Sequence, residues 1–353
     1  MPTDPVSGSE NLVIRPSSPS DIEDFYELAT LAGAGFTSLP ANEAVLAERL
    51  SASARAFEGE PGVLMLVLED RSQRRVVGCA AVKPGGTPRP DFLNFSITDS
   101  ALTPTSRYAD MTEVGSLLLH PDYRKSGIGP WLAKSRYLLI ATDLERFGGN
   151  IFSELRGVVD ADDRSPFYDA VCAPYFGCSF AEADDRCAHG RQGELNALLP
   201  AHPIPLESLP PSASAAMAQP HQAGRRALDY LDQEGFRFEG VVDLLDGGPA
   251  VVAETRSIGT ISQSFEALLQ PCDIDDEISA EAYIAVGIGP DFRCWRAGVS
   301  LGHDGEVRCP PDVLEPPSSQ DTSTARVRLV DDRAQSLAQC GDAVARQEGL
   351  LVG

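Results

Sequence analysis

A glycine-containing loop at residues 124–129 has the residue types needed to bind an anion. Its spacing is Arg124-x-x-Gly127-x-Gly129, and it joins an apolar run at 114–119 to a stretch with helical spacing of apolar residues. Glycines let a phosphate approach the backbone, and the first N–H groups of a helix lie unpaired at the positive end of its dipole. We therefore expect a pyrophosphate to bind at Arg124, Lys125, Ser126, Gly127, Ile128 and Gly129.

The charge around this loop is opposite to that of the whole chain. Four cations and no acid lie between Arg124 and Arg136, whereas the formal net charge of the chain is -23. The spacing is not the dinucleotide fingerprint, whose first glycine would stand at Arg124, and no Gly-Lys-Ser/Thr follows for a Walker loop. An ordinary helix cap or surface turn can have the same letters, so this alternative stays open.

Composition narrows the class of protein. With 353 residues and 42% apolar residues, the chain can bury a globular core of two domains, or of one domain with a large addition. The acidic balance argues against nucleic-acid binding and against docking on an anionic membrane. The apolar runs are too short for a membrane helix and the first ten residues lack the apolar segment of a signal peptide, so we expect a cytoplasmic protein.

The eight cysteines show no CxxC spacing, which argues against a disulfide framework and against a zinc knuckle. Cys178, Cys187 and His189 are close enough in sequence to leave a metal site conceivable, although free thiols are the expected state. We predict no metal and no permanently bound cofactor.

The elements that must hold the loop can be predicted from apolar periodicity. A strand at 114–119 precedes the loop, and Pro130 lies in the first turn of the helix that follows, where a missing N–H is tolerated. Residues 31–43 form a loop of small residues, and residues 92–111 fit a strand fragment with an exposed loop. The other expected elements are strands at 12–15, 62–69, 75–82 and 150–158 and helices at 21–31, 43–56 and 165–171, with 62–82 forming a hairpin.

The last half of the chain adds an insertion and a β-rich region. A helix at 227–235 and a strand at 236–243 follow the insertion, and short β-prone runs after residue 250 predict a small β-barrel or sandwich. Residues 310–323 are expected to be a loop. The predicted organisation is an α+β protein with a disordered segment at 1–11, a domain at 12–249 with an insertion at about 173–220, and a β-rich domain at 250–353 that can end in a helix at 333–348.

The loop resembles the acyl-CoA signature of the GNAT superfamily of N-acyltransferases, Arg/Gln-x-x-Gly-x-Gly/Ala after a strand. The order of elements is also the order that a GNAT core requires, a mixed and largely antiparallel sheet flanked by helices. Several longer segments resemble the arginine N-succinyltransferase family and follow its order through most of residues 12–250. They are LAGAGFTSLPANE (31–43), LHPDYRKSGIG (119–129), RGVVDADDRSPFYDAV (156–171), AEAD (181–184), LLPAHPI (198–204) and ALDYLDQEGFRFEGVVDLLDGGP (227–249).

This resemblance implies a reaction and the residues that carry it. In the family, succinyl-CoA donates a succinyl group to the α-amino nitrogen of L-arginine, and some members assemble from two related chains, which implies a homo-oligomer or a hetero-oligomer. The family's proton-donating histidine lies in a Gln-x-His segment fourteen residues before a glycine, which His221 matches relative to Gly235. Leu117 matches a leucine that contacts succinyl-CoA, and Glu113 matches a glutamate at the start of the same strand.

Acyl transfer from a thioester to an amine needs a held pyrophosphate, a donor to the oxyanion, removal of a proton from the amine and protonation of the thiolate. A bulged amide near Leu117 can serve the oxyanion, His221 can carry a proton, and Glu113 can act as a base. Arg156 is a further candidate to bind a carboxylate of either substrate. The structural alternatives are a surface histidine, a solvated glutamate and an ordinary ion pair.

The chain departs from the family pattern at two places. Pro220 and Gln222 replace a valine and a proline beside the histidine, and the stretch between Asn94 and Glu113 is shorter, with Ser96 where the family has an arginine. Three functions therefore stay open: an arginine N-succinyltransferase, an acyl-CoA N-acyltransferase with another amine acceptor, and a non-catalytic subunit that binds acyl-CoA in a hetero-oligomer.

Overall fold

The computed structural model describes residues 11–32, 39–87, 89, 91–124, 127–160, 162, 164–272, 277–302, 305–314 and 324–331. The expected disordered segment at 1–11 lies almost entirely outside these residues, as do the expected helix at 333–348 and the centre of the loop at 31–43. Of the expected loop at 310–323, only the part that contains the short helix α12 (Pro311–Leu314) is described.

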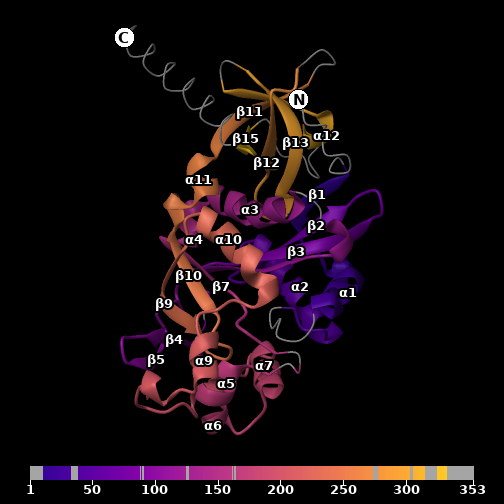
Figure 1. The fold of residues 1–353 in the computed structure, drawn as a ribbon. Helices are drawn as coiled ribbons and strands as arrows, with labels where there is room; N and C mark the ends of the chain where they lie inside the picture. The colour runs from indigo at the N-terminus through magenta and orange to yellow at the C-terminus, as the bar shows by residue number, and fades with distance from the viewer. Residues whose placement is uncertain are drawn as a thin grey trace, which may run out of the picture.

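A ten-stranded sheet runs through the centre of the molecule (Figure 1). All of its neighbouring strands are antiparallel except β6 and β7, which are parallel. In spatial order the strands are β1 (Leu12–Pro16), β2 (Leu64–Asp70), β3 (Arg75–Lys83), β6 (Thr112–Leu119), β7 (Asn150–Glu154), β10 (Pro249–Glu254), β9 (Arg237–Asp243), β4 (Asn94–Ile97), β5 (Ala101–Thr105) and β8 (Ile204–Pro205).

Helices cover both faces of this sheet, because alternate residues of its inner strands point to opposite sides. Met65 and Val67 of β2 pack under α1 (Ile22–Ala32) and α2 (Glu43–Phe57). The side chain of Asn42 caps the start of α2. Leu64, Leu66 and Leu68 pack with α3 (Ile128–Ala141) on the other face, together with α10 (Arg225–Gln233) and α11 (Gly259–Gln263). The predicted helices at 21–31 and 43–56 are thereby confirmed.

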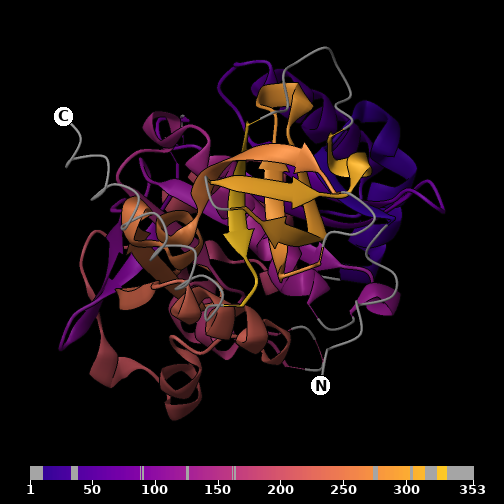
Figure 2. The same cartoon turned by 90° about the horizontal axis from the view of Figure 1, so that it is seen from above.

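Five strands of the C-terminal region close into a ring, seen from above in Figure 2. The ring runs β12 (Ala280–Val286), β15 (Thr324–Leu329), β11 (Phe265–Pro271), β14 (Glu306–Cys309) and β13 (Arg293–Leu301), and β13 pairs again with β12. Its interior is filled by apolar side chains such as Ile284, Trp295 and Val327. The predicted small β-barrel is confirmed. A bridge between Ile14 of β1 and Cys294 of β13 joins it to the main sheet.

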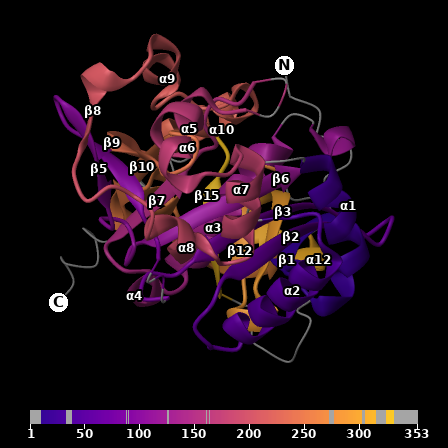
Figure 3. The same ribbon diagram turned by 90° about the horizontal axis from the view of Figure 1, so that it is seen from below.

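The insertion, together with the helix predicted at 165–171 that precedes it, forms a helical group at the end of the molecule opposite the barrel (Figures 1 and 3). Its aromatic core, including Phe167 and Tyr168, packs against Phe95 of β4 and Leu102 of β5. The helices of this group are α5 (Pro166–Val171), α6 (Ala173–Phe176), α7 (Phe180–Ala188), α8 (Gln192–Asn196) and α9 (Pro211–Ala216).

The structure differs from the sequence prediction at three places. Residues 92–111 contain a complete β4–β5 hairpin rather than a strand fragment, because its buried side chains pack on the insertion. The strand predicted at 150–158 ends at Glu154. The boundary at about residue 250 remains a prediction, but β10 is hydrogen-bonded between β7 and β9 and so belongs to the central sheet.

Candidate active site

Strands β6 and β7 separate after a short parallel contact. Their pairing covers only Thr112 with Ile151 and Glu113 with Phe152, although β6 continues to Leu119. The next two carbonyls of β6 receive side-chain hydrogen bonds: Ser153 Oγ donates to Val114 O at 2.8 Å, and Arg136 Nη1 donates to Gly115 O at 3.4 Å. Beyond these residues, the β6 edge toward β7 has no strand partner within the described part of the chain.

A β-bulge interrupts β6 where this edge is open. The pairing with β3 shifts between Cys79, opposite Leu118, and Ala81, opposite Gly115, and Ser116 takes a left-handed conformation with φ 51°. Bulges redirect backbone amides away from the ladder. The bulge that we expected near Leu117 is confirmed, and the side chain of Leu117 packs on the apolar core around α3, which leaves its main chain as the polar group.

The glycine loop lies at the end of β6, as predicted. A short 3-10 helix (Pro121–Tyr123) leads to Arg124, which is exposed and whose Nε donates to Leu119 O at 3.1 Å. Helix α3 begins at Ile128 with Gly127 as its N-cap, and the φ of +85° at Gly127 favours glycine. A Cβ on Gly129 would meet no atom within 4 Å, so this backbone faces open space. Lys125 and Ser126 lie outside the described residues.

Two of the four cations counted around the loop do not face it. Lys134 Nζ binds Glu234 Oε1 at 2.5 Å and also contacts the hydroxyl of Thr260, so it joins α3 to the elements beside it. Arg136 is only 4% exposed and is directed at β6. The sequence-based view of a four-cation patch is therefore wrong for these two residues, because both are bonded to groups far away in sequence.

Charged side chains gather at the other end of β6. Glu113 Oε2 accepts a hydrogen bond from Arg89 Nη1 at 2.8 Å, and Lys83 is its partner in the β3–β6 register. The side chain of Glu113 is 26% exposed and is ion-paired rather than freely solvated. Burial, and secondly the charge of Arg89, lower the pKa of Lys83.

Glu154, which the sequence analysis did not single out, lies at the end of β7 beside this group. Its Oε1 accepts a hydrogen bond from Asn94 Nδ2 at 2.5 Å, and burial followed by the negative charges of Asp243 and Glu113 raises its pKa well above the ordinary value. An ionisable residue two positions after the apolar strand residues Ile151 and Phe152 was the available sequence signal.

His221 is fixed beside the chain that leaves β7. Pro220 forms a bridge with Gly157, and His221 N donates to Arg156 O at 2.7 Å. His221 Nδ1 accepts a hydrogen bond from the N–H of Ala223 at 3.3 Å, so the neutral ring carries its proton on Nε2. Burial, followed by the positive charge of Arg156, lowers the pKa of His221, which favours the neutral ring at pH 7.

The predicted residues thus fall into two groups along β6. Glu113 lies at the start of the strand beside Glu154, and His221 is tied to the segment two residues after Glu154. Leu117 lies at the bulge, and Arg124, Gly127, Ile128 and Gly129 follow the end of the strand. The titratable residues and the glycine loop therefore lie at opposite ends of the same strand.

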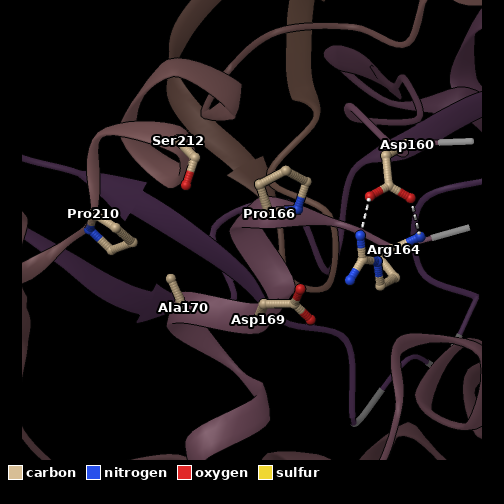
Figure 4. A pocket seen from close by; sticks show the side chains of 7 residues that line it. All are labelled: Asp160, Arg164, Pro166, Asp169, Ala170, Pro210 and Ser212. Carbon is tan, nitrogen blue, oxygen red and sulfur yellow. Dashed lines mark hydrogen bonds and ion pairs between the residues drawn. The ribbon is translucent and has the colours of Figure 1, made fainter. Parts of the chain in front are cut away.

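Two surface depressions lie away from these residues. The first, shown in Figure 4, is lined by Asp160, Arg164, Pro166, Asp169, Ala170, Pro210 and Ser212, and the Arg164 side chain is held by Asp160. The second is lined by Tyr26, Ala41, Asn42, Glu43, Ala44 and Ala47. Neither depression contains a predicted site residue.

Within the described ranges, no group of three or more histidine, cysteine or acidic side chains is arranged to hold a metal ion. Cys178, Cys187 and His189 therefore do not form such a group. Among these same residues, no helix has both the length and the apolar character needed to cross a bilayer.

Known proteins resemble most of this chain. A family model described as arginine N-succinyltransferase beta subunit matches residues 12–260. The arginine N-succinyltransferase of Yersinia pestis (strain Pestoides F) is 32% identical over 327 residues, covering 86% of this chain and 93% of the relative. That of Escherichia coli O139:H28 is 30% identical over 271 residues, covering 72% and 79%.

A solved structure shows the same fold. Arginine/ornithine succinyltransferase subunit AI from Pseudomonas aeruginosa superposes with a TM-score of 0.79 and 24% identity, over 91% of this chain and 99% of that chain. The α+β architecture with a GNAT-like core and a barrel, expected from the sequence, is confirmed.

Proposed function

This chain belongs to the arginine N-succinyltransferase family, and we propose that it moves a succinyl group from succinyl-CoA to the α-amino group of L-arginine. The observation that carries the proposal is the open, bulged edge of β6 between a titratable cluster and a glycine-capped helix start. Family membership makes the chain an acyl-CoA-dependent acyltransferase. The succinyl donor and the arginine acceptor are the finer proposal.

The glycine end of β6 holds the coenzyme in this mechanism. The N–H groups of Gly127, Ile128 and Gly129 at the start of α3 bind the pyrophosphate, and the exposed cation Arg124 neutralises part of its charge. Lys125 and Ser126 of the same loop are assigned to the phosphates by their place in the motif. The thioester then lies along the open edge of β6. The amide beside Leu117 donates to the carbonyl oxygen, which becomes the oxyanion of the tetrahedral intermediate.

The other end performs the proton transfers. Glu113 removes the extra proton from the acceptor's ammonium group, and the amine nitrogen attacks the thioester carbon. Neutral His221 takes the proton that the nitrogen loses on attack. When the C–S bond breaks, His221 gives this proton to the departing thiolate, for which an imidazolium of lowered pKa is a strong enough acid. The products are an amide and free coenzyme A.

A cationic acceptor suits the acidic side chains beside the point where β6 and β7 separate. Glu154 has acidic neighbours, Asp243 and Glu113, that raise its pKa, and a guanidinium placed there would reverse this unfavourable interaction. Asn94, at the base of the β4–β5 hairpin, orients Glu154. The residue that directly precedes the shortened segment is therefore placed on the acceptor side.

Purified protein incubated with succinyl-CoA and a panel of amino acids, with free thiol measured, tests the proposal. Thiol release with arginine supports it. Release only with other amines favours a changed acceptor, an alternative motivated by the short hairpin between Asn94 and Glu113. Coenzyme binding without turnover favours a binding subunit of a hetero-oligomer. A cytoplasmic location and a homo- or hetero-oligomeric state belong to the same proposal.

A further inference from the structure

An arginine of the C-terminal barrel lies against the glycine loop. Arg296 is on β13, and a Cβ built on Gly127 would lie 2.8 Å from its Cζ and closer still to its Nη1. Gly127 is the N-cap of α3, and α3 lies next to the barrel in Figure 1. The guanidinium of Arg296 therefore occupies the space beside the first turn of α3, on a residue that is only 8% exposed.

One side of this guanidinium is paired and the other is not. Arg296 Nε donates to Glu281 Oε1 at 2.7 Å and Nη2 donates to Glu281 Oε2 at 2.9 Å, which is a bidentate ion pair. Nη1 is buried and has no hydrogen-bond partner within the described residues. Glu281 thus fixes the orientation of the side chain and leaves Nη1 directed at the loop.

Glu281 offsets part of the charge of this guanidinium, but the placement of Nη1 beside the start of α3 remains unfavourable without a second acceptor. The start of α3 carries the positive end of a helix dipole and N–H groups without intrahelical partners, and a cation is destabilised beside it. A buried donor without an acceptor adds a further cost. A phosphate oxygen beside Gly127 would accept from Nη1 and from the helix N–H groups together.

We propose that Arg296 is a phosphate ligand of the acyl-CoA, so that the barrel provides one wall of the coenzyme site. The inference rests on the proposed function, since it assigns a residue of the barrel to the same coenzyme. Arg296 contacts the phosphate, and Glu281, on β12, is its positioning residue. The barrel thereby acquires a role in binding beyond packing against α3.

Titration calorimetry with coenzyme A tests this on the full-length chain. Arg296→Met should weaken binding roughly ten- to a hundredfold, the range for losing a charged hydrogen bond. Arg326→Met is the matched control. It removes the same charge from the same barrel, but Arg326 is bonded to Ser264 and Glu266, so coenzyme affinity should not change. Arg296→Lys keeps a cation but loses the planar guanidinium. Its affinity for coenzyme A should lie between those of the wild-type chain and the Met variant.

A truncated donor separates binding from a structural role. Acyl-pantetheine lacks the nucleotide and the diphosphate, so Arg296→Met should lower kcat/KM for acyl-CoA and leave kcat/KM for acyl-pantetheine unchanged. Equal losses with both donors would overturn the inference. Should the Met variant not fold, the Lys variant carries the test, because it retains a cation beside Glu281.

The outcomes also distinguish this inference from the proposed function. If the wild-type chain binds no coenzyme A, the proposed function fails. If the wild-type chain binds it and the Met and Lys variants bind equally well, only the role of Arg296 fails.

Discussion

The two ends of β6 differ in how their charges are matched. At the start, Glu113 is paired with Arg89, and Glu154 is bonded to Asn94. At the far end, no side chain caps the start of α3 with a hydrogen bond, and the Nη1 of Arg296 has no hydrogen-bond partner within the described residues. The comparison teaches that the charges at one end are paired within the chain itself, whereas the other end keeps an unpaired buried donor, to which we have assigned an anion from outside.

The largest effect that separates the two ends should come from His221→Ala. Loss of the proton carrier should lower kcat on the order of a hundred- to ten-thousandfold, as is typical for general acid–base groups. The dissociation constant of coenzyme A should stay unchanged, because His221 belongs to the acceptor end. Thiol release and calorimetry measure the two quantities, and unchanged turnover would remove His221 from the mechanism.

Gly127→Ala should damage the other end. The φ of +85° and the contact with Arg296 both oppose a side chain, so the free energy of unfolding should fall by about 1–3 kcal/mol. Coenzyme A affinity should fall as well, because Arg296 must move. Denaturant unfolding and calorimetry provide the measurements.

Gly129→Ala is the matched variant for this experiment. Its Cβ meets open space within the first turn of the helix, so stability should be kept or slightly raised. Coenzyme affinity should still fall, because a methyl group would hold the phosphate away from the backbone. Equal stability of the two variants would contradict the role assigned to the Gly127 conformation.

Glu154→Gln should have a smaller and more selective effect. The KM for the acceptor should rise about tenfold through loss of one charged hydrogen bond, with coenzyme affinity unchanged. Stability should not fall, because burial and two acidic neighbours already disfavour the charged carboxylate. Glu239→Gln, at an exposed ion pair with Arg107, is the control and should leave the KM for the acceptor and the affinity for coenzyme A unchanged. A change in coenzyme affinity with Glu154→Gln would break the separation of the two ends.

The smallest expected effect is a shift in titration. Burial and the charge of Arg156 destabilise the imidazolium of His221, so its pKa should lie below 6.5. Since the mechanism begins with neutral His221, kcat/KM should fall as the pH is lowered through that pKa. Because the pKa of His221 is lower in the folded state, folding favours the neutral ring. The contribution of His221 to the free energy of unfolding is therefore present above pH 6.5 and is lost as the pH falls through the pKa of His221 in the folded state.

Proton NMR of the His221 ring measures this titration directly. Arg156→Met should move the pKa upward toward 6.5, but not fully, because burial is the larger cause. A ring that titrates above 6.5 in the wild-type chain would contradict the assignment.

The local features of the site were predictable from the sequence, and the pairing of its charges was not. The loop, the helix start at Ile128 and the strand before it follow from glycine spacing and apolar periodicity. The bonds of Lys134 to Glu234 and of Arg136 to β6 depend on tertiary contacts that no spacing reveals. Arg296 stands within a run predicted only as a β-strand, and its contact with Gly127 spans the chain from the central region to the barrel.

The bridge between Ile14 and Cys294 has a consequence for biosynthesis. The first strand of the chain finds this neighbour only after nearly 300 residues have been made, so the pairing is highly non-local and closes late during folding. The ribosome makes the glycine loop well before it makes β13, which carries Arg296. The surroundings of the loop are therefore completed only after β13 has been synthesised.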